Sequence, residues 1–260
     1  MPVDIQQAAS QKASPRQTTR QKVMREILSW VWLLLALFFV ESTMAQNRLI
    51  PSGSMERTIL VGDHMVVSPF GYSLCVPYTE LHVPLWRNPK RQQIIILVSP
   101  LNGTEDLIKR VIGVPGDSIR IHQGIVYVNG NRLKEPYVLR DPADMASSLE
   151  NFPSKNDGVY DGLTPKWAAA LPSHIHDGAL VVPPNDYFVM GDNRGDSYDS
   201  RYWGFVPRRN IIATPLFIFM SIRAPESVWQ PGHIGERMET YLSIFVHPSE
   251  VRWHRLFHGF

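Results

Sequence analysis

The stretch LIKRVIGVPGDSIRIHQGIVYVNG, residues 107–130, decides the fold class, because it alternates short β-branched runs with turn residues. The runs Leu107 to Val114, Ser118 to Ile121 and Ile125 to Val128 are short and rich in Ile and Val, which predicts strands. Asn129-Gly130, which follows the last run, is a residue pair that two-residue hairpin turns prefer. The stretch therefore predicts consecutive strands joined by tight turns.

Runs of the same kind flank this stretch, and no helical period of comparable strength occurs between Ile50 and Met220. The further predicted strands are Met65 to Val67, Ile94 to Val98, Tyr187 to Met190 and Leu216 to Ile222. The last of these, LFIFMSI, is too short to cross a bilayer and is expected to be a buried strand. The sequence predicts a mainly β domain over residues 46–225.

Composition excludes several classes of protein. A chain of 260 residues can bury a sizeable core, and its net charge of +2 is too small to favour nucleic acid as a partner. The single cysteine, Cys75, excludes an internal disulfide framework and a cysteine-based metal site. No P-loop, G-x-G-x-x-G or H-E-x-x-H motif is present, so no cofactor and no metal are expected.

The N-terminus predicts a membrane anchor. The apolar run Ile27 to Val40 is short for a span, but residues 23–45 are long enough once the flanks are included. Residues 1–22 are polar and predict a disordered tail, and their basic residues together with Arg25 place this end in the cytoplasm. A cleavable signal peptide cut after Thr43-Met44-Ala45 is the alternative, which the long charged region before the run disfavours.

Two further segments differ in texture from the β body. Residues 131–185 are rich in Pro, Asp and Ser and predict a small inserted subdomain, with a short helix at Lys166 to Leu171. Residues 226–260 form a C-terminal tail in which Ile234 to Val246 could be helical.

Three constellations could carry chemistry, and the first is IPSGSMERTILVGDHMVV, residues 50–67. Pro51 and Gly53 force a turn that could present the Ser54 hydroxyl. A serine-rich turn without a catalytic role would have the same sequence. The second is the strand around Lys109, where alternation groups Lys109 with Leu107 and Val111 on one face. A lysine desolvated there can lose its proton near neutral pH and act as a base, unless it only protects a strand edge.

The third constellation is the loop VMGDNRGDSYDSRYWGFVP, residues 189–207. It is not an EF-hand, because Arg194 and Trp203 occupy positions that require calcium ligands. Asp192 and Asp199 are expected to pair with Arg194 or Arg201 and to fix the shape of the loop.

Other catalytic arrangements fail on spacing. No G-x-S-x-G elbow surrounds Ser54, and no serine precedes a lysine by three residues. A Ser-His-Asp site with His64 or His82 stays open on composition.

Together, the three segments resemble the signal peptidase I family. PSGSM resembles its nucleophile box, IKRVIGVPGD its general-base box and GDNRGDSYDSRYWG its third box, in the family's order and behind an anchor. The resemblance implies an N-terminal transmembrane helix followed by an antiparallel β catalytic domain with a small inserted subdomain. It implies a membrane serine endopeptidase that removes signal peptides from preproteins after small residues at −1 and −3.

The resemblance also implies roles for single residues. Ser54 is the expected nucleophile, Lys109 the general base, and Ser52 with the Ser54 N–H the oxyanion site. Ser197 is expected to orient the lysine, with Asp199 and Arg201 in support. The implied location is the inner (cytoplasmic) membrane, in contact with lipid, with the catalytic domain on the periplasmic or extracytoplasmic face.

The chain departs from the family pattern at two places, and rival readings remain. Arg57 stands where the family usually has proline, and Arg91-Gln92-Gln93 replaces the usual Arg-Gly-Asp. A maturation peptidase of a secretion or conjugation system would share the dyad and the anchor, and a non-enzymatic membrane-tethered β module would share only the anchor and the fold. LexA-type repressors carry a DNA-binding module that this N-terminus lacks.

Overall fold

The computed structural model describes residues 19–75, 81–103, 105–139, 148–153 and 162–260. Most of the predicted N-terminal tail, and parts of the predicted insertion, lie outside these described residues. The chain divides into two compact units, Met1–Val40 and Glu41–Phe260.

Helix α1, Thr19–Thr43, dominates the first unit. An 18-residue window of it has a mean hydropathy of 1.9, and none of that window is buried inside the protein. A helix of 25 residues is about 37 Å long, enough to cross the hydrocarbon core of a bilayer. The described helix includes Arg20 and Lys22 in its first turn, ahead of the predicted anchor, residues 23–45.

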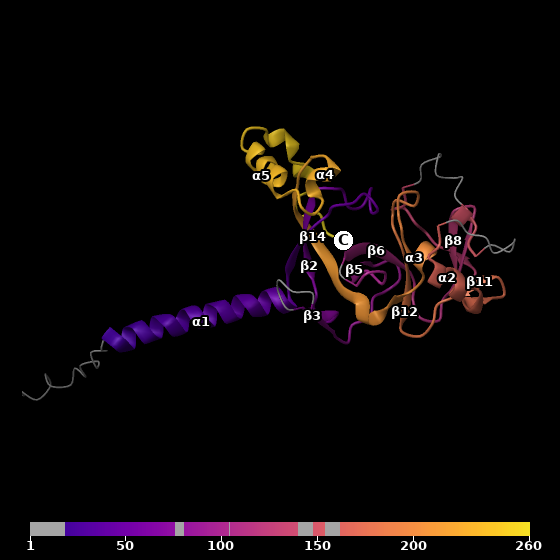
Figure 1. Ribbon diagram of the computed structural model, residues 1–260, viewed down its shortest axis with the longest axis horizontal. Helices are drawn as coiled ribbons and strands as arrows, with labels where there is room; N and C mark the ends of the chain where they lie inside the picture. The colour runs from indigo at the N-terminus through magenta and orange to yellow at the C-terminus, as the bar shows by residue number, and fades with distance from the viewer. Residues whose placement is uncertain (1–18, 76–80, 104, 140–147, 154–161) are drawn as a thin grey trace, which may run out of the picture. The chain divides into compact units, whose positions relative to one another are not determined.

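Seven strands of the second unit form one antiparallel sheet in the order β1-β2-β14-β5-β6-β12-β13. Figure 1 labels five of them, β2, β14, β5, β6 and β12. Their bounds are β1 Gln46–Leu49, β2 Asp63–Ser68, β5 Ile94–Val98, β6 Asp106–Gly113, β12 Asp186–Met190, β13 Val206–Pro207 and β14 Ile211–Ser221.

The longest strand, β14, lets this sheet curl. Its first residues pair with β5 and its later residues with β2, and its register shifts next to Pro215. Proline has no N–H to donate to a ladder, so a register irregularity is where it fits in a strand.

A second antiparallel sheet has the order β10-β11-β7-β8-β9, and a third pairs β3 with β4. Their strands are β3 Ser73–Cys75, β4 His82–Pro84, β7 Ser118–His122, β8 Ile125–Val128, β9 Asn131–Arg132, β10 Ile175–His176 and β11 Ala179–Val181. The shorter helices are η2 Ser148–Glu150, α2 Pro165–Ala170, η3 Leu171–His174, α3 Ser200–Trp203, η4 Arg208–Asn210, α4 Glu226–Trp229, α5 Ile234–Ser243, η5 Pro248–Glu250 and η6 Trp253–Arg255.

The strands predicted from apolar runs are confirmed, and so is the tight turn, although the predicted buried strand 216–222 is only partly buried, with Leu216 42% exposed. Asn129 and Gly130 have φ values of 52° and 77°, the positive angles that the turn between β8 and β9 requires. On β6, Leu107 and Val111 pack in one apolar cluster while Ile108 packs in another, as alternation predicts. The second sheet joins β7 and β8 to strands from the predicted insertion.

Candidate active site

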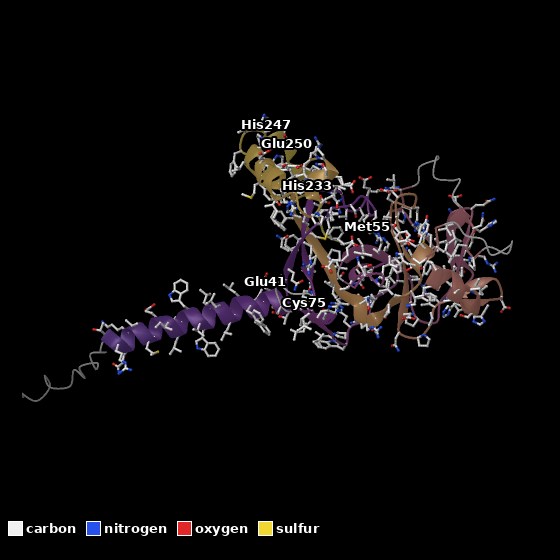
Figure 2. All side chains as sticks on the ribbon, viewed as in Figure 1. Glu41, Met55, Cys75, His233, His247 and Glu250 are labelled. Atoms are coloured by element: carbon white, nitrogen blue, oxygen red, sulfur yellow. The ribbon has the colours of Figure 1, made fainter. Side chains whose placement is uncertain are left out.

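Ser54 lies in a tight turn between β1 and β2, and we call residues 51–63 the Ser54 turn. Within it the Glu56 N–H donates to the Gly53 carbonyl and the Ile59 N–H donates to the Met55 carbonyl, both at 2.9 Å. Met55, labelled in Figure 2, and Ile59 are 1% and 0% exposed and pack in an apolar cluster with residues of the sheet. Two buried anchors therefore hold the turn while the Ser54 side chain stays half-buried above them.

Lys109, near the middle of β6, reaches this turn. Its Nζ donates to Ser54 Oγ at 2.7 Å, and the residue is only 3% exposed. Burial lowers the pKa of Lys109 from 10.5 to about 8, because desolvation disfavours the ammonium more than the charge of Asp199 favours it. In the neutral form the contact reverses, since the Ser54 O–H then donates to the lone pair on Nζ.

The third segment supplies a buried cluster beside the lysine. Arg201 Nε donates to Asp199 Oδ1 at 2.8 Å, and Ser197 Oγ donates to Asp199 Oδ2 at 2.8 Å. Burial alone would raise the pKa of Asp199, but the Arg201 charge and its hydrogen bonds hold that pKa below its usual value. The predicted Asp199–Arg201 pair is confirmed. The Ser197 hydroxyl binds Asp199 in this structure, whereas the resemblance implied that it orients Lys109.

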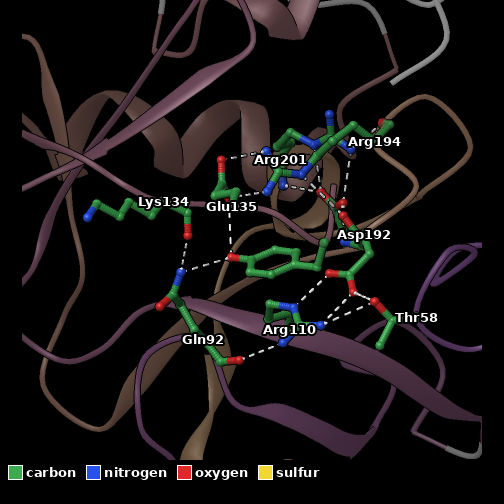
Figure 3. A network of polar contacts seen from close by, with 11 residues as sticks. Thr58, Gln92, Arg110, Lys134, Glu135, Asp192, Arg194 and Arg201 are labelled. Carbon is green, nitrogen blue, oxygen red and sulfur yellow. Dashed lines mark hydrogen bonds and ion pairs between the residues drawn. The ribbon is translucent and has the colours of Figure 1, made fainter. Parts of the chain in front are cut away.

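Asp192 pairs with Arg110 rather than with Arg194 or Arg201, so that part of the prediction was wrong (Figure 3). Arg110 donates to Asp192 through Nε at 2.7 Å and through Nη2 at 2.6 Å, and Thr58 Oγ1 donates to Asp192 Oδ2 at 2.6 Å. Arg194 pairs instead with Glu135. The two charged residues next to each other on β6 thus have different roles: Lys109 faces Ser54, and Arg110 ties the third segment to the Ser54 turn.

Gly191 shows how closely the third segment approaches Ser54. A Cβ placed on Gly191 would lie 2.3 Å from Ser197 Oγ and 2.4 Å from the Ser54 carbonyl oxygen, where no side chain fits. Next to it, the Asn193 N–H donates to the Ser54 carbonyl at 3.2 Å. The close approach of the third segment to the Ser54 turn therefore explains why position 191 is a glycine.

Arg57 also follows from the conformation of the turn. Its φ of 83° lies in the left-handed region, which proline cannot adopt because its ring fixes φ near −65°. The Arg57 side chain donates to the Val138 carbonyl at 2.8 Å. At position 57 the backbone conformation excludes proline, and the hydrogen bond from the Arg57 side chain to Val138 holds the turn instead.

A cleft of about 230 Å³ opens beside the Ser54 hydroxyl. Ser52, Ser54 and Lys109 line it together with apolar side chains, and Ser52 is exposed. Gln230 from the C-terminal segment also lines it, a residue that the sequence patterns did not single out. A larger hollow of about 940 Å³ lies against the second sheet, and none of the candidate residues lines its described part.

The histidine alternative is not supported by the contacts of His64. Its Nε2 lies 2.7 Å from the Tyr241 hydroxyl and its Nδ1 lies 3.1 Å from the Gly62 carbonyl, so both ring nitrogens face partners other than Ser54. Burial lowers the pKa of His64. His82 lies on β4 in the separate two-stranded sheet. Within the described ranges, no group of three or more His, Cys, Asp or Glu side chains could hold a metal ion.

Comparison with known proteins identifies the family to which the chain belongs. Residues 23–220 match the family model described as "Signal peptidase, peptidase S26". The chain is 32% identical over 222 residues to the probable signal peptidase I-1 of Synechocystis, covering 85% of this chain and 90% of the relative. It is 31% identical over 205 residues to signal peptidase I of Pseudomonas aeruginosa, covering 75% and 71%.

A crystal structure of a signal peptidase I from Enterococcus faecalis is 33% identical, with a TM-score of 0.34, covering 49% of this chain and 97% of that one. With the apolar helix α1, the family indicates a membrane-anchored protein. The chain belongs to the signal peptidase I family and is a hydrolase of the signal peptidase type.

Proposed function

We propose that this chain is a membrane-bound serine endopeptidase that removes N-terminal signal peptides from exported preproteins through a Ser54/Lys109 dyad. The observation that carries the proposal is the 2.7 Å contact between Lys109 Nζ and Ser54 Oγ at a buried lysine. A serine hydroxyl is a weak nucleophile until an adjacent base takes its proton. A lysine whose pKa is lowered to about 8 supplies a neutral amine for this purpose near physiological pH.

The reaction then proceeds in two steps. Neutral Nζ takes the Ser54 proton as Oγ attacks the scissile carbonyl, and the resulting ammonium returns that proton to the leaving amine as the peptide C–N bond breaks. Water, deprotonated by the same amine, attacks the acyl-enzyme ester, and the proton goes back to Ser54 Oγ. Asp199 and Arg201 stay paired with each other, and neither residue donates or accepts the transferred proton.

The negative charge on the carbonyl oxygen is the second requirement. The Ser54 backbone N–H and the Ser52 hydroxyl are the proposed donors, because Ser52 is exposed and lines the cleft with Ser54 and Lys109. Such donors act on charge that develops in the transition state.

The Ser52→Ala variant is expected to fold normally and to lose roughly 10²–10³ in kcat, the usual effect of removing one oxyanion donor. Steady-state kinetics on a preprotein measures this. A change confined to KM would reject the role of Ser52.

The preference for small residues at −1 and −3 is part of this proposal because the resemblance to the family implies it. Ile50 and Met55 give the cleft apolar walls beside Ser54 and Lys109.

Helix α1 is proposed to anchor the enzyme in the inner membrane, in contact with lipid, with the N-terminus cytoplasmic and the catalytic unit outside. The support is its apolar surface and the basic residues Arg20, Lys22 and Arg25 at its start.

An uncleaved anchor should leave the protein in the pellet after carbonate extraction of membranes, with the N-terminus intact. N-terminal sequencing of the extracted protein checks this. A mature protein that begins at Gln46 would show that the apolar helix is a cleaved signal peptide instead.

The rival within the same chemistry is a maturation peptidase of a secretion or conjugation system. Mass spectrometry of the products from a membrane-bound preprotein tests the proposal. Cleavage after small residues at −1 and −3, at the end of the signal peptide, supports it. Preproteins that stay intact, while a pilin-like or conjugation substrate is cut, would overturn it.

A further inference from the structure

The C-terminal segment, residues 226–260, begins beyond the matched family region, which ends at residue 220. Its helices α4 and α5 lie beside one end of β14 (Figure 1), and Figure 2 labels His233, His247 and Glu250 within it. Rather than a loose tail, the segment is a folded layer that contacts the Ser54 turn.

Trp229 fixes this segment to the β body. The side chain is 1% exposed, and its ring lies edge-on to the His64 ring with centroids 5.5 Å apart. Tyr241 from α5 bonds His64 Nε2 at 2.7 Å through its hydroxyl. Gly62 of the Ser54 turn lies against the same indole, since a Cβ there would meet Trp229 Nε1 at 3.1 Å.

Three side chains of the segment donate to backbone carbonyls of the Ser54 turn. Gln230 Nε2 donates to Pro51 O at 3.1 Å, Arg255 Nη2 to Thr58 O at 2.9 Å, and Arg252 Nη1 to Val61 O at 3.0 Å. These carbonyls lie before, within and after the part of the turn that carries Ser54.

Arg255 also holds the end of the turn through a buried ion pair. Its Nη2 donates to Asp63 Oδ2 at 2.6 Å, and Asp63 is 0% exposed. The same carboxylate accepts the Leu60 N–H at 2.8 Å. The turn is thus held by Asp192 and Asn193 from the third segment and, independently, by the C-terminal segment.

We propose that the C-terminal segment is a positioning element of the active site, in which Gln230 and Arg255 hold the Ser54 turn in its reactive geometry and Gln230 completes the cleft wall. The inference rests on the proposed peptidase function. Pro51 is adjacent to Ser52, so the Gln230 hydrogen bond acts one residue from the proposed oxyanion donor. Displacement of reacting groups by about 1 Å can lower the rate by ~10²-fold, so hydrogen bonds that hold the Ser54 turn in place affect the catalytic rate.

The Gln230→Met variant tests this, because it keeps the approximate length of the side chain and removes the amide that donates to the Pro51 carbonyl. We expect kcat to fall by about tenfold with little change in KM, as for loss of geometry rather than of substrate binding. The melting temperature should change by no more than about 4 °C, as expected for one partly exposed hydrogen bond. Arg255 donates to both carboxylate oxygens of Asp63, through Nε at 3.2 Å and Nη2 at 2.6 Å. Arg255→Lys keeps the charge but loses this two-point contact, and should lower kcat in the same way.

Arg223→Lys and Glu239→Gln are matched controls, because both side chains are exposed and lie near or within the segment away from the cleft. Their kcat should equal that of the unchanged enzyme. A fall in melting temperature at Gln230 or Arg255 without a fall in kcat would show a merely structural role and overturn the proposal.

Hydrogen exchange separates this inference from the proposed function. In a Ser54→Ala background, Gln230→Met and Arg255→Lys should speed exchange at the Glu56, Ile59 and Gly62 amides, with the controls unchanged. These amides donate within or next to the turn, so their protection reports its order without any catalysis. If the unchanged enzyme cleaves preproteins but neither variant changes the exchange protection or kcat, the inference is overturned and the proposed function stands. Failure of the unchanged enzyme to cleave any preprotein overturns the proposed function.

Discussion

Lys109→Arg is expected to leave preprotein cleavage nearly abolished, although it preserves the positive charge. The guanidinium keeps its proton at any pH the protein survives, so it cannot accept the proton from Ser54 Oγ. Cleavage should be measured with purified enzyme in detergent, with Lys166→Arg as the control, since Lys166 is exposed on α2. Substantial activity of Lys109→Arg would remove the lysine from the mechanism.

Lys109→Met separates catalysis from stability. It should be equally inactive, yet at least as stable as the unchanged protein at pH 7, because Asp199 keeps its partner Arg201 and a group that is costly to bury is gone. The folded pKa of about 8 lies below the unfolded value of 10.5, so the unfolded state binds more protons between them.

The burial cost of Lys109 is therefore fully present below pH 8 and disappears as the pH rises toward 10.5. It is on the order of 3 kcal/mol. The stability gain of Lys109→Met should shrink over that range, and chemical denaturation at several pH values measures it. A stability gain of Lys109→Met that grows as the pH rises would contradict a buried lysine with a lowered pKa.

Ser54→Ala should abolish preprotein cleavage while leaving expression, membrane location and melting temperature intact. The loss should approach the full contribution of covalent catalysis, since no other hydroxyl bonds Lys109 Nζ among the described residues. Ser173→Ala is the matched control, because that hydroxyl is exposed and bonds only the nearby Ala170 carbonyl at the end of α2. Residual turnover comparable to the unchanged enzyme would place the nucleophile elsewhere.

Much of the β architecture could be predicted because it depends on local pattern. The turn at Asn129-Gly130 and the alternation along β6 require only neighbouring residues, and both are confirmed. The two-sided pairing of β14 could not be predicted, because its partners β2 and β5 are distant in the sequence.

The candidate site shows the same division. A forced turn and a lysine in an apolar strand are local features that marked Ser54 and Lys109 as candidates, and the resemblance to the family implied their roles. The structure brings the two side chains within 2.7 Å. The Arg110–Asp192 pair escaped prediction because 82 positions separate its members and nearer arginines compete for the same carboxylate. Gln230 gave no signal, since a single glutamine in a helix-rich tail matches no motif.

The pH dependence of kcat/KM for the unchanged enzyme tests the neutral-lysine dyad most directly, using a preprotein-derived peptide that lacks histidine and has a blocked N-terminus. The profile reports ionisations of the free enzyme when the substrate carries none in this range. The account predicts a rise of about tenfold per pH unit that levels off near pH 8, the pKa that burial imposes on Lys109. A rise that levels off at or below 6.5, the ordinary pKa of histidine, would contradict the Ser54/Lys109 dyad.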